Sequence, residues 1–142
     1  MSDDCIFCAI VDGDIPARIV RETDHTVAFL DANPLAPGHT LVVPRDHHER
    51  VADLPEEVSE TLFSEVTQLV PRAEAAVDAD GLNVGINDGS AAGQEVPHVH
   101  VHVVPRFDGD GGAPIHAVAG ERPELSEAEL DDIADAIESG GQ

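Results

Sequence analysis

The chain has 142 residues, 29 of them acidic and seven basic, so its formal net charge is −22 at neutral pH. This length predicts a single domain over residues 1–142, and the charge disfavours nucleic acid and anionic membranes as partners. All seven basic residues are arginines, which excludes Schiff-base and P-loop lysine chemistry. Because 42% of the residues are apolar, we expect a packed core and interpret the acidity as halophilic adaptation to a salt-rich cytoplasm.

The sequence predicts neither a signal peptide nor a membrane span. The first residues lack the basic region and apolar run of a signal peptide, and no apolar stretch approaches the 18 residues that a membrane span requires. We therefore expect a cytoplasmic protein.

The periodicity of apolar residues predicts an α+β domain with a five-stranded antiparallel sheet, one long helix and short terminal helices. Pro71 lies inside the long helical pattern and is expected to kink or split that helix near Val70. Ser126 and Glu129 form a capping-box pattern that begins the last helix. The expected helices cover residues 5–11, 58–77 and 127–138, and the expected strands cover residues 18–22, 25–30, 40–43, 82–86 and 98–104.

Three histidines alternate with valines between Pro97 and Pro105. On a strand, alternate side chains share one face, so His98, His100 and His102 are expected to form a row while the valines enter the core. Imidazole can attack an electrophile, accept a proton or bind a metal near neutral pH. The run therefore predicts a catalytic or metal-binding row of imidazoles.

A loop of small residues, 87–93, precedes the histidine run. Backbone amides in such a loop can approach an oxyanion closely, as in phosphate-binding nests. In a chain without lysine, these amides, the histidines and Arg106 are the groups available to bind phosphate.

Cys5 and Cys8 form a CxxC motif, which is typical of either zinc or redox sites. A tetrahedral zinc site needs two further ligands, and His47 or His48 and one histidine of the run are the candidates. Redox cysteines and plain apolar cysteines remain alternatives. His25 and His116 are interpreted as structural.

Several segments together resemble the histidine triad (HIT) family, in its Hint-like nucleotide-binding branch. The resemblance covers about residues 5–107 and leaves 108–142 as a variable C-terminal extension. The segments that carry it are Cys5-Ile6-Phe7-Cys8, Asp14-Ile15-Pro16-Ala17, residues 29–44 with Asp31 and His39, Asn83-Val84-Gly85-Ile86-Asn87, and residues 93–106 with the histidine run.

The resemblance implies the five-stranded antiparallel sheet and a homodimer. It also implies hydrolysis or transfer of nucleoside monophosphates from purine nucleoside phosphoramidates, acyl-adenylates or dinucleoside polyphosphates. His100 would be the nucleophile and His102 and His39 the other catalytic residues, while His98 would be either a further member of this catalytic row or a zinc ligand. Nucleotide-binding residues would be Asp31 at the ribose and Asn87, Gly93, Gln94, Val96 and His102 near the phosphate, and a structural zinc would be held by Cys5, Cys8, His47 and His98.

One departure from the family pattern concerns the leaving group. Many relatives carry Ser or Thr where this chain has Glu95, and an ionised carboxylate there would repel phosphate. Three functions are compatible with the sequence: a nucleotidyl hydrolase with a covalent histidine intermediate, a zinc-dependent metallohydrolase that uses the histidine strand, and a nucleotide-binding adaptor with little turnover.

Overall fold

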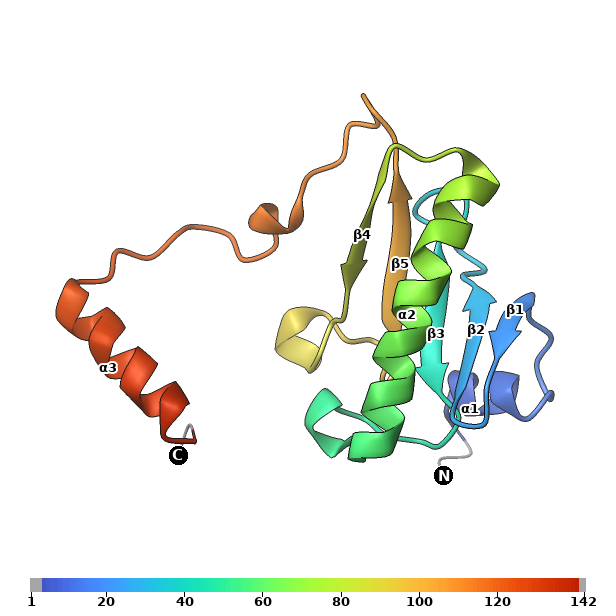
Figure 1. Cartoon of the computed structure of the whole chain (residues 1–142), viewed down its shortest axis with the longest axis horizontal. Coiled ribbons are helices and arrows are strands. Elements are labelled where there is room, and N and C mark those ends of the chain that lie inside the picture. Colours follow the sequence, from blue (N-terminus) through green and yellow to red (C-terminus); the bar gives the residue numbers. More distant parts are fainter. Residues whose placement is uncertain (1–3, 141–142) are drawn as a thin grey trace. The chain divides into compact units, whose positions relative to one another are not determined.

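The computed structural model describes residues 4–140, and the chain divides into two compact units after Gly112 (Figure 1). The first unit holds a five-stranded sheet in which every neighbouring pair is antiparallel, in the order β1-β2-β3-β5-β4. The predicted α+β class and sheet are thus confirmed. The strands are β1 (Ile19–Glu22), β2 (Thr26–Leu30), β3 (Thr40–Pro44), β4 (Gly81–Gly85) and β5 (Val101–Arg106).

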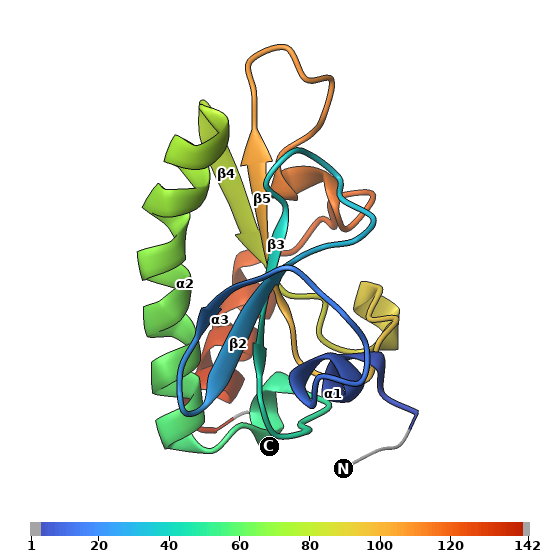
Figure 2. The same ribbon diagram turned by 90° about the vertical axis from the view of Figure 1, so that its right-hand side faces the viewer.

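Two helices cover opposite faces of the sheet (Figure 2). The long helix α2 (Glu56–Val77) packs Leu62 and Val66 against Val42 and the valines of β5. The short helix α1 (Ile6–Val11) packs Phe7 and its cysteines against the other face. Because side chains alternate along a strand, Val101 and Val103 of β5 face α2, and His102 points to the side of α1.

The helix α2 is continuous through Pro71, so the expected split near Val70 is wrong. Proline removes one N–H and displaces the carbonyl four residues earlier. Both Pro71 and Thr67, which carries that carbonyl, are exposed, so water can satisfy the freed group. Leu69 and Ala73 on either side are buried in the core and hold the helix in place.

The histidine strand begins later than expected. The β5 ladder starts at Val101, opposite Val42, and residues 98–100 precede it. His98 N–H donates to the Val96 carbonyl and Val99 N–H donates to the His48 carbonyl, so this backbone bonds to loops instead of a neighbouring strand. The single row of three imidazoles is therefore interrupted at His98.

Short 3-10 turns lie at Val51–Asp53, Ser90–Ala92 and Ile115–Ala117. The second unit contains the last of these and helix α3 (Glu127–Glu138). Ser126 caps that helix by accepting from Glu129 N–H, and Glu129 accepts from Ser126 N–H, which confirms the capping box. Among residues 4–140, no helix is long and apolar enough to cross a membrane.

Candidate active site and metal centre

His100 is oriented by its own chain. Its Nδ1 lies 2.8 Å from the His98 carbonyl oxygen, which can only accept, so Nδ1 carries the proton. A neutral imidazole then has its lone pair on Nε2. The ring is 7% exposed and lies next to Phe7 and His102, with ring centroids 4.9 Å away in each case. The arrangement holds the ring so that Nε2 of its neutral form can act as a nucleophile.

His39 and His102 form a second hydrogen-bonded pair. Leu35 N–H donates to His39 Nδ1 at 3.0 Å, so His39 carries its proton on Nε2. That Nε2 lies 3.0 Å from His102 Nδ1, which must therefore accept, leaving the His102 proton on Nε2. Burial lowers the pKa of His39, and burial followed by repulsion from His100 and His39 lowers the pKa of His102 to about 4. Both rings are neutral at pH 7, and His102 offers an N–H donor.

The same hydrogen bonds argue against a metal shared by this pair. Asp31, His39 and His102 bring their donor atoms within 4.8 Å of one another, with Asp31 Oδ2 3.7 Å from His39 Nε2. A metal ligand needs a lone pair, but His39 Nε2 holds the proton because Nδ1 accepts from Leu35. The cluster is better described as a histidine pair beside a carboxylate.

His98 belongs to a different cluster. Its Nδ1 lies 3.3 Å from Cys5 Sγ and 3.5 Å from Cys8 Sγ, and Cys8 Sγ lies 3.4 Å from His47 Nδ1. The His98 Nε2–H donates to the Pro44 carbonyl at 2.8 Å, which places its lone pair on Nδ1, toward the sulfurs. Burial lowers the pKa of His98 to about 4, so the ring stays neutral.

These four residues fit a tetrahedral zinc ion. Their donor atoms all lie within 4.8 Å of one another. Zinc–sulfur and zinc–nitrogen bonds of ordinary length at tetrahedral angles separate S from N by about 3.5 Å, close to the spacings observed. Neither cysteine forms a disulfide. The sequence left His47 and His48 as alternative zinc ligands, and it is His47 that joins the cluster. The Nε2 atom of His48 is buried and has no hydrogen-bond partner among the described residues.

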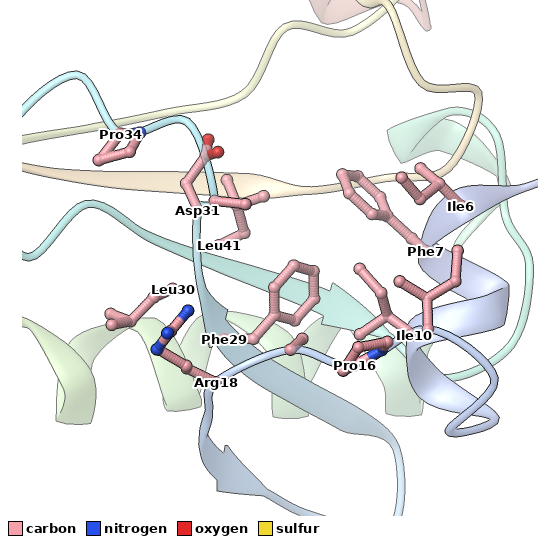
Figure 3. A pocket seen from close by; sticks show the side chains of 13 residues that line it. Ile6, Phe7, Ile10, Pro16, Arg18, Phe29, Leu30, Asp31, Pro34 and Leu41 are labelled. Atoms are coloured by element: carbon pink, nitrogen blue, oxygen red, sulfur yellow. The ribbon is translucent and has the colours of Figure 1, made fainter.

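A pocket of about 470 Å³ lies between α1 and the open face of the sheet (Figure 3). Its walls are apolar except for Arg18 and Asp31, and Asp31 stands at the side nearest Pro34. Asp31 was predicted from the sequence, but the apolar walls were not. The signal for them was the alternation of residues 26–30, which puts Val27 and Phe29 on the face away from α2. The apolar lining residues are Ile6, Phe7, Ile10, Ile15, Pro16, Ala17, Phe29, Leu30, Ala32, Pro34 and Leu41.

A model of the HIT domain matches residues 12–109. The chain belongs to the HIT domain family. An uncharacterised HIT-like protein of Methanocaldococcus jannaschii is 47% identical over 107 residues, covering 75% of this chain and 82% of its own. The adenosine 5′-monophosphoramidase HNT1 of Saccharomyces cerevisiae is 38% identical over 108 residues, covering 76% of this chain and 66% of its own. A crystal structure of a zinc-bound histidine triad family protein from Mycobacterium smegmatis matches with a TM-score of 0.71 and 36% identity, covering 94% of this chain and 97% of its own.

The loop before the histidines of this HIT domain is braced by Gln94. Its Oε1 accepts from Gly89 N–H at 2.7 Å, and its Nε2 donates to the Glu49 and Val96 carbonyls. The amides of residues 92–94 are bonded within the loop as well. The Gln94 side chain thus holds the loop in place.

Other polar residues singled out in the sequence are paired with other side chains or are exposed. Arg106 makes a bidentate pair with Asp110, at 2.8 and 2.9 Å, and also donates to Asn83, so this arginine is not available for phosphate. His25 faces Glu57 on the surface at 3.3 Å. Glu95 is exposed.

Proposed function

We propose that this HIT protein is a hydrolase or transferase that moves a nucleoside monophosphate from a purine nucleoside phosphoramidate, acyl-adenylate or dinucleoside polyphosphate through a covalent intermediate on His100. The observation that carries the proposal is the hydrogen bond from His100 Nδ1 to the His98 carbonyl. In the neutral ring this bond places the lone pair on Nε2, the nitrogen that would attack. The related yeast adenosine 5′-monophosphoramidase supports the same class of reaction.

The proposed reaction has two steps. His100 Nε2 attacks phosphorus, the bond from phosphorus to the leaving group breaks, and the leaving group departs with the electron pair and takes a proton from solvent. The ring then carries phosphorus on Nε2 and a proton on Nδ1, and the His98 carbonyl stabilises this cation. Water next attacks phosphorus, the bond to Nε2 breaks, its electron pair returns to Nε2, and the water proton passes to solvent.

The surrounding residues would hold the nucleotide during both steps. His102 Nε2–H, fixed by the hydrogen bond from His39, is a donor for a phosphate oxygen. One carboxylate oxygen of Asp31 accepts a hydrogen bond from Asn33 N–H at 2.9 Å. This bond orients the carboxylate so that it could accept hydrogen bonds from the ribose hydroxyls. The apolar pocket has the size and lining expected for a purine base.

We also propose that Cys5, Cys8, His47 and His98 bind a structural zinc ion. The support is the fit of the four donor atoms and the zinc-bound relative from Mycobacterium smegmatis. With four protein ligands the ion has no open position, so it would fix α1 to the sheet and take no part in the chemistry.

The decisive experiment identifies the residue to which the phosphorus atom becomes attached. Wild-type protein is mixed with adenosine 5′-phosphoramidate, quenched in milliseconds and analysed by mass spectrometry. We expect an adenylyl group on His100, and His100→Ala should lose at least about 10³-fold in turnover while retaining AMP binding. His25→Ala, a surface histidine, is the matched control and should react normally. An adduct on another residue would show that the reaction follows a different mechanism. AMP binding with no turnover would show that the protein is a nucleotide-binding adaptor.

A further inference from the structure

Phe7 joins the cysteine–histidine cluster to the nucleophile. Its ring centroid lies 4.9 Å from that of His100, 5.9 Å from that of His98 and 5.6 Å from that of Phe29. All three contacts are edge-to-face, with interplanar angles of 72°, 84° and 62°, respectively. The Phe7 side chain is 7% exposed and lines the apolar pocket (Figure 3).

The position of Phe7 depends on the cysteines. Helix α1 has only six residues, which is too short to be stable by itself in water. Cys5 caps its first turn by accepting from Cys8 N–H, and both sulfurs contact His98 on the sheet side. Since Phe7 lies between the two cysteines in the chain, anchoring them fixes the ring over His100.

The hydrogen bond from His100 to the His98 carbonyl does not fix the ring plane. That bond sets the tautomer and one point of the imidazole, but the ring can still tilt about it. Phe7 and His102 each contact the His100 ring at 4.9 Å, with interplanar angles of 72° and 65°. Together they confine the direction in which Nε2 points.

We infer that Phe7 is a positioning residue for the nucleophile: held by the cysteine–histidine cluster, its ring fixes the plane of the His100 imidazole so that Nε2 faces the bound phosphorus. The inference rests on the proposed function, because it assigns Phe7 a role in the attack by His100. A misaimed nucleophile reacts more slowly even when the substrate is fully bound.

The test separates attack from binding. Phe7→Leu keeps an apolar wall but removes the aromatic edge. In single-turnover experiments with saturating adenosine 5′-phosphoramidate, we expect the rate constant for adenylylation of His100 to fall by about three- to ten-fold. Phe7→Tyr, which keeps the ring, should restore most of that rate. Phe63→Leu makes the same change at an exposed site on α2 and should react as the wild type does.

We also measure the metal content and the AMP affinity of each variant, because a purely structural effect of the substitution would change these two quantities. A Phe7→Leu variant that only packs badly would bind less AMP or metal yet adenylylate at the normal rate when saturated, and this result would overturn the inference. If the wild type forms no adduct on His100, the proposed function fails and takes this inference with it. If the adduct forms equally fast in the wild type and Phe7→Leu, only the role of Phe7 is lost.

Discussion

Burial keeps His102 uncharged. Desolvation is the largest cause that lowers its pKa to about 4, and repulsion from His100 and His39 adds to it, while Asp31 partly opposes the shift. A neutral His102 can accept from His39 through Nδ1 and still offer its Nε2–H. Protonation of its Nδ1 would place two N–H groups against each other and break the pair.

The sign of the resulting pH dependence follows from linkage. An unfolded histidine titrates near pH 6.5, so between pH 6.5 and about 4 the unfolded state binds more protons than the folded state. This contribution to stability is complete above pH 6.5 and is lost as the pH falls toward 4. We expect the free energy of unfolding of the wild type to decrease over this window by up to about 3 kcal/mol more than that of His102→Gln. Urea titrations at several pH values measure it. Equal pH dependence in the two proteins would contradict the assignment, since titration of the carboxylates is common to both.

The residue types of the candidate site were predictable from the sequence, and the family resemblance grouped Cys5, Cys8, His47 and His98, which the structure brings together. The hydrogen-bond partners of the site residues were not predictable. Alternation placed the valines of the histidine run in the core, as the structure confirms. It could not indicate that His98 leaves the row, because that depends on Cys5, Cys8 and the Pro44 carbonyl, which are distant in sequence. The engagement of the Gln94 side chain by Gly89 and Glu49 is likewise a tertiary contact that no local pattern encodes.

At the scale of helices and strands too, the local pattern was predictable from the sequence and the tertiary contacts were not. Periodicity predicted α2 and all five strands, although β1 and β4 contain no fully buried residue. The helix-breaking rule for proline failed at Pro71, and the strand alternation failed at the start of β5, where exposure and loop contacts decide the outcome. The pocket was missed because it forms between α1 and β2, which approach only in the folded chain.

Helix α1 should depend on the metal that we propose for its cysteines. Purified protein should contain about one zinc ion per chain. Removing zinc with a chelator, or the variants Cys8→Ser and His47→Asn, should speed hydrogen exchange in residues 6–11 and weaken AMP binding by about ten-fold, because α1 forms one wall of the pocket. His25→Asn is the matched control for His47→Asn and should keep its zinc. By reciprocity, AMP should raise the affinity of the protein for zinc by the same factor. The zinc site would be ruled out if protein purified without a chelator contained no metal and if added zinc left its AMP affinity unchanged.

Over the whole molecule, negative charge is poorly compensated. Among the described residues, four arginines pair with carboxylates: Arg21 with Glu65, Arg45 with Glu22, Arg50 with Asp88, and Arg106 with Asp110. These pairs involve few of the 29 acidic residues. Most other carboxylates face water and one another, as on α3, which has acidic residues in its first turn and no basic residue in its last.

This surplus predicts a stability that depends on salt. Charges of one sign repel across the surface, and the screening length falls from about 10 Å at 0.1 M salt to about 3 Å at 1 M. We expect the free energy of unfolding to rise by at least about 2 kcal/mol between 0.1 M and 2 M KCl, with partial unfolding on dialysis into dilute buffer. Sucrose at matched osmolality is the control, since it favours compact states without screening charge. A protein that is fully folded in dilute buffer and gains no more from KCl than from sucrose would show that its acidic surface is not an adaptation to salt.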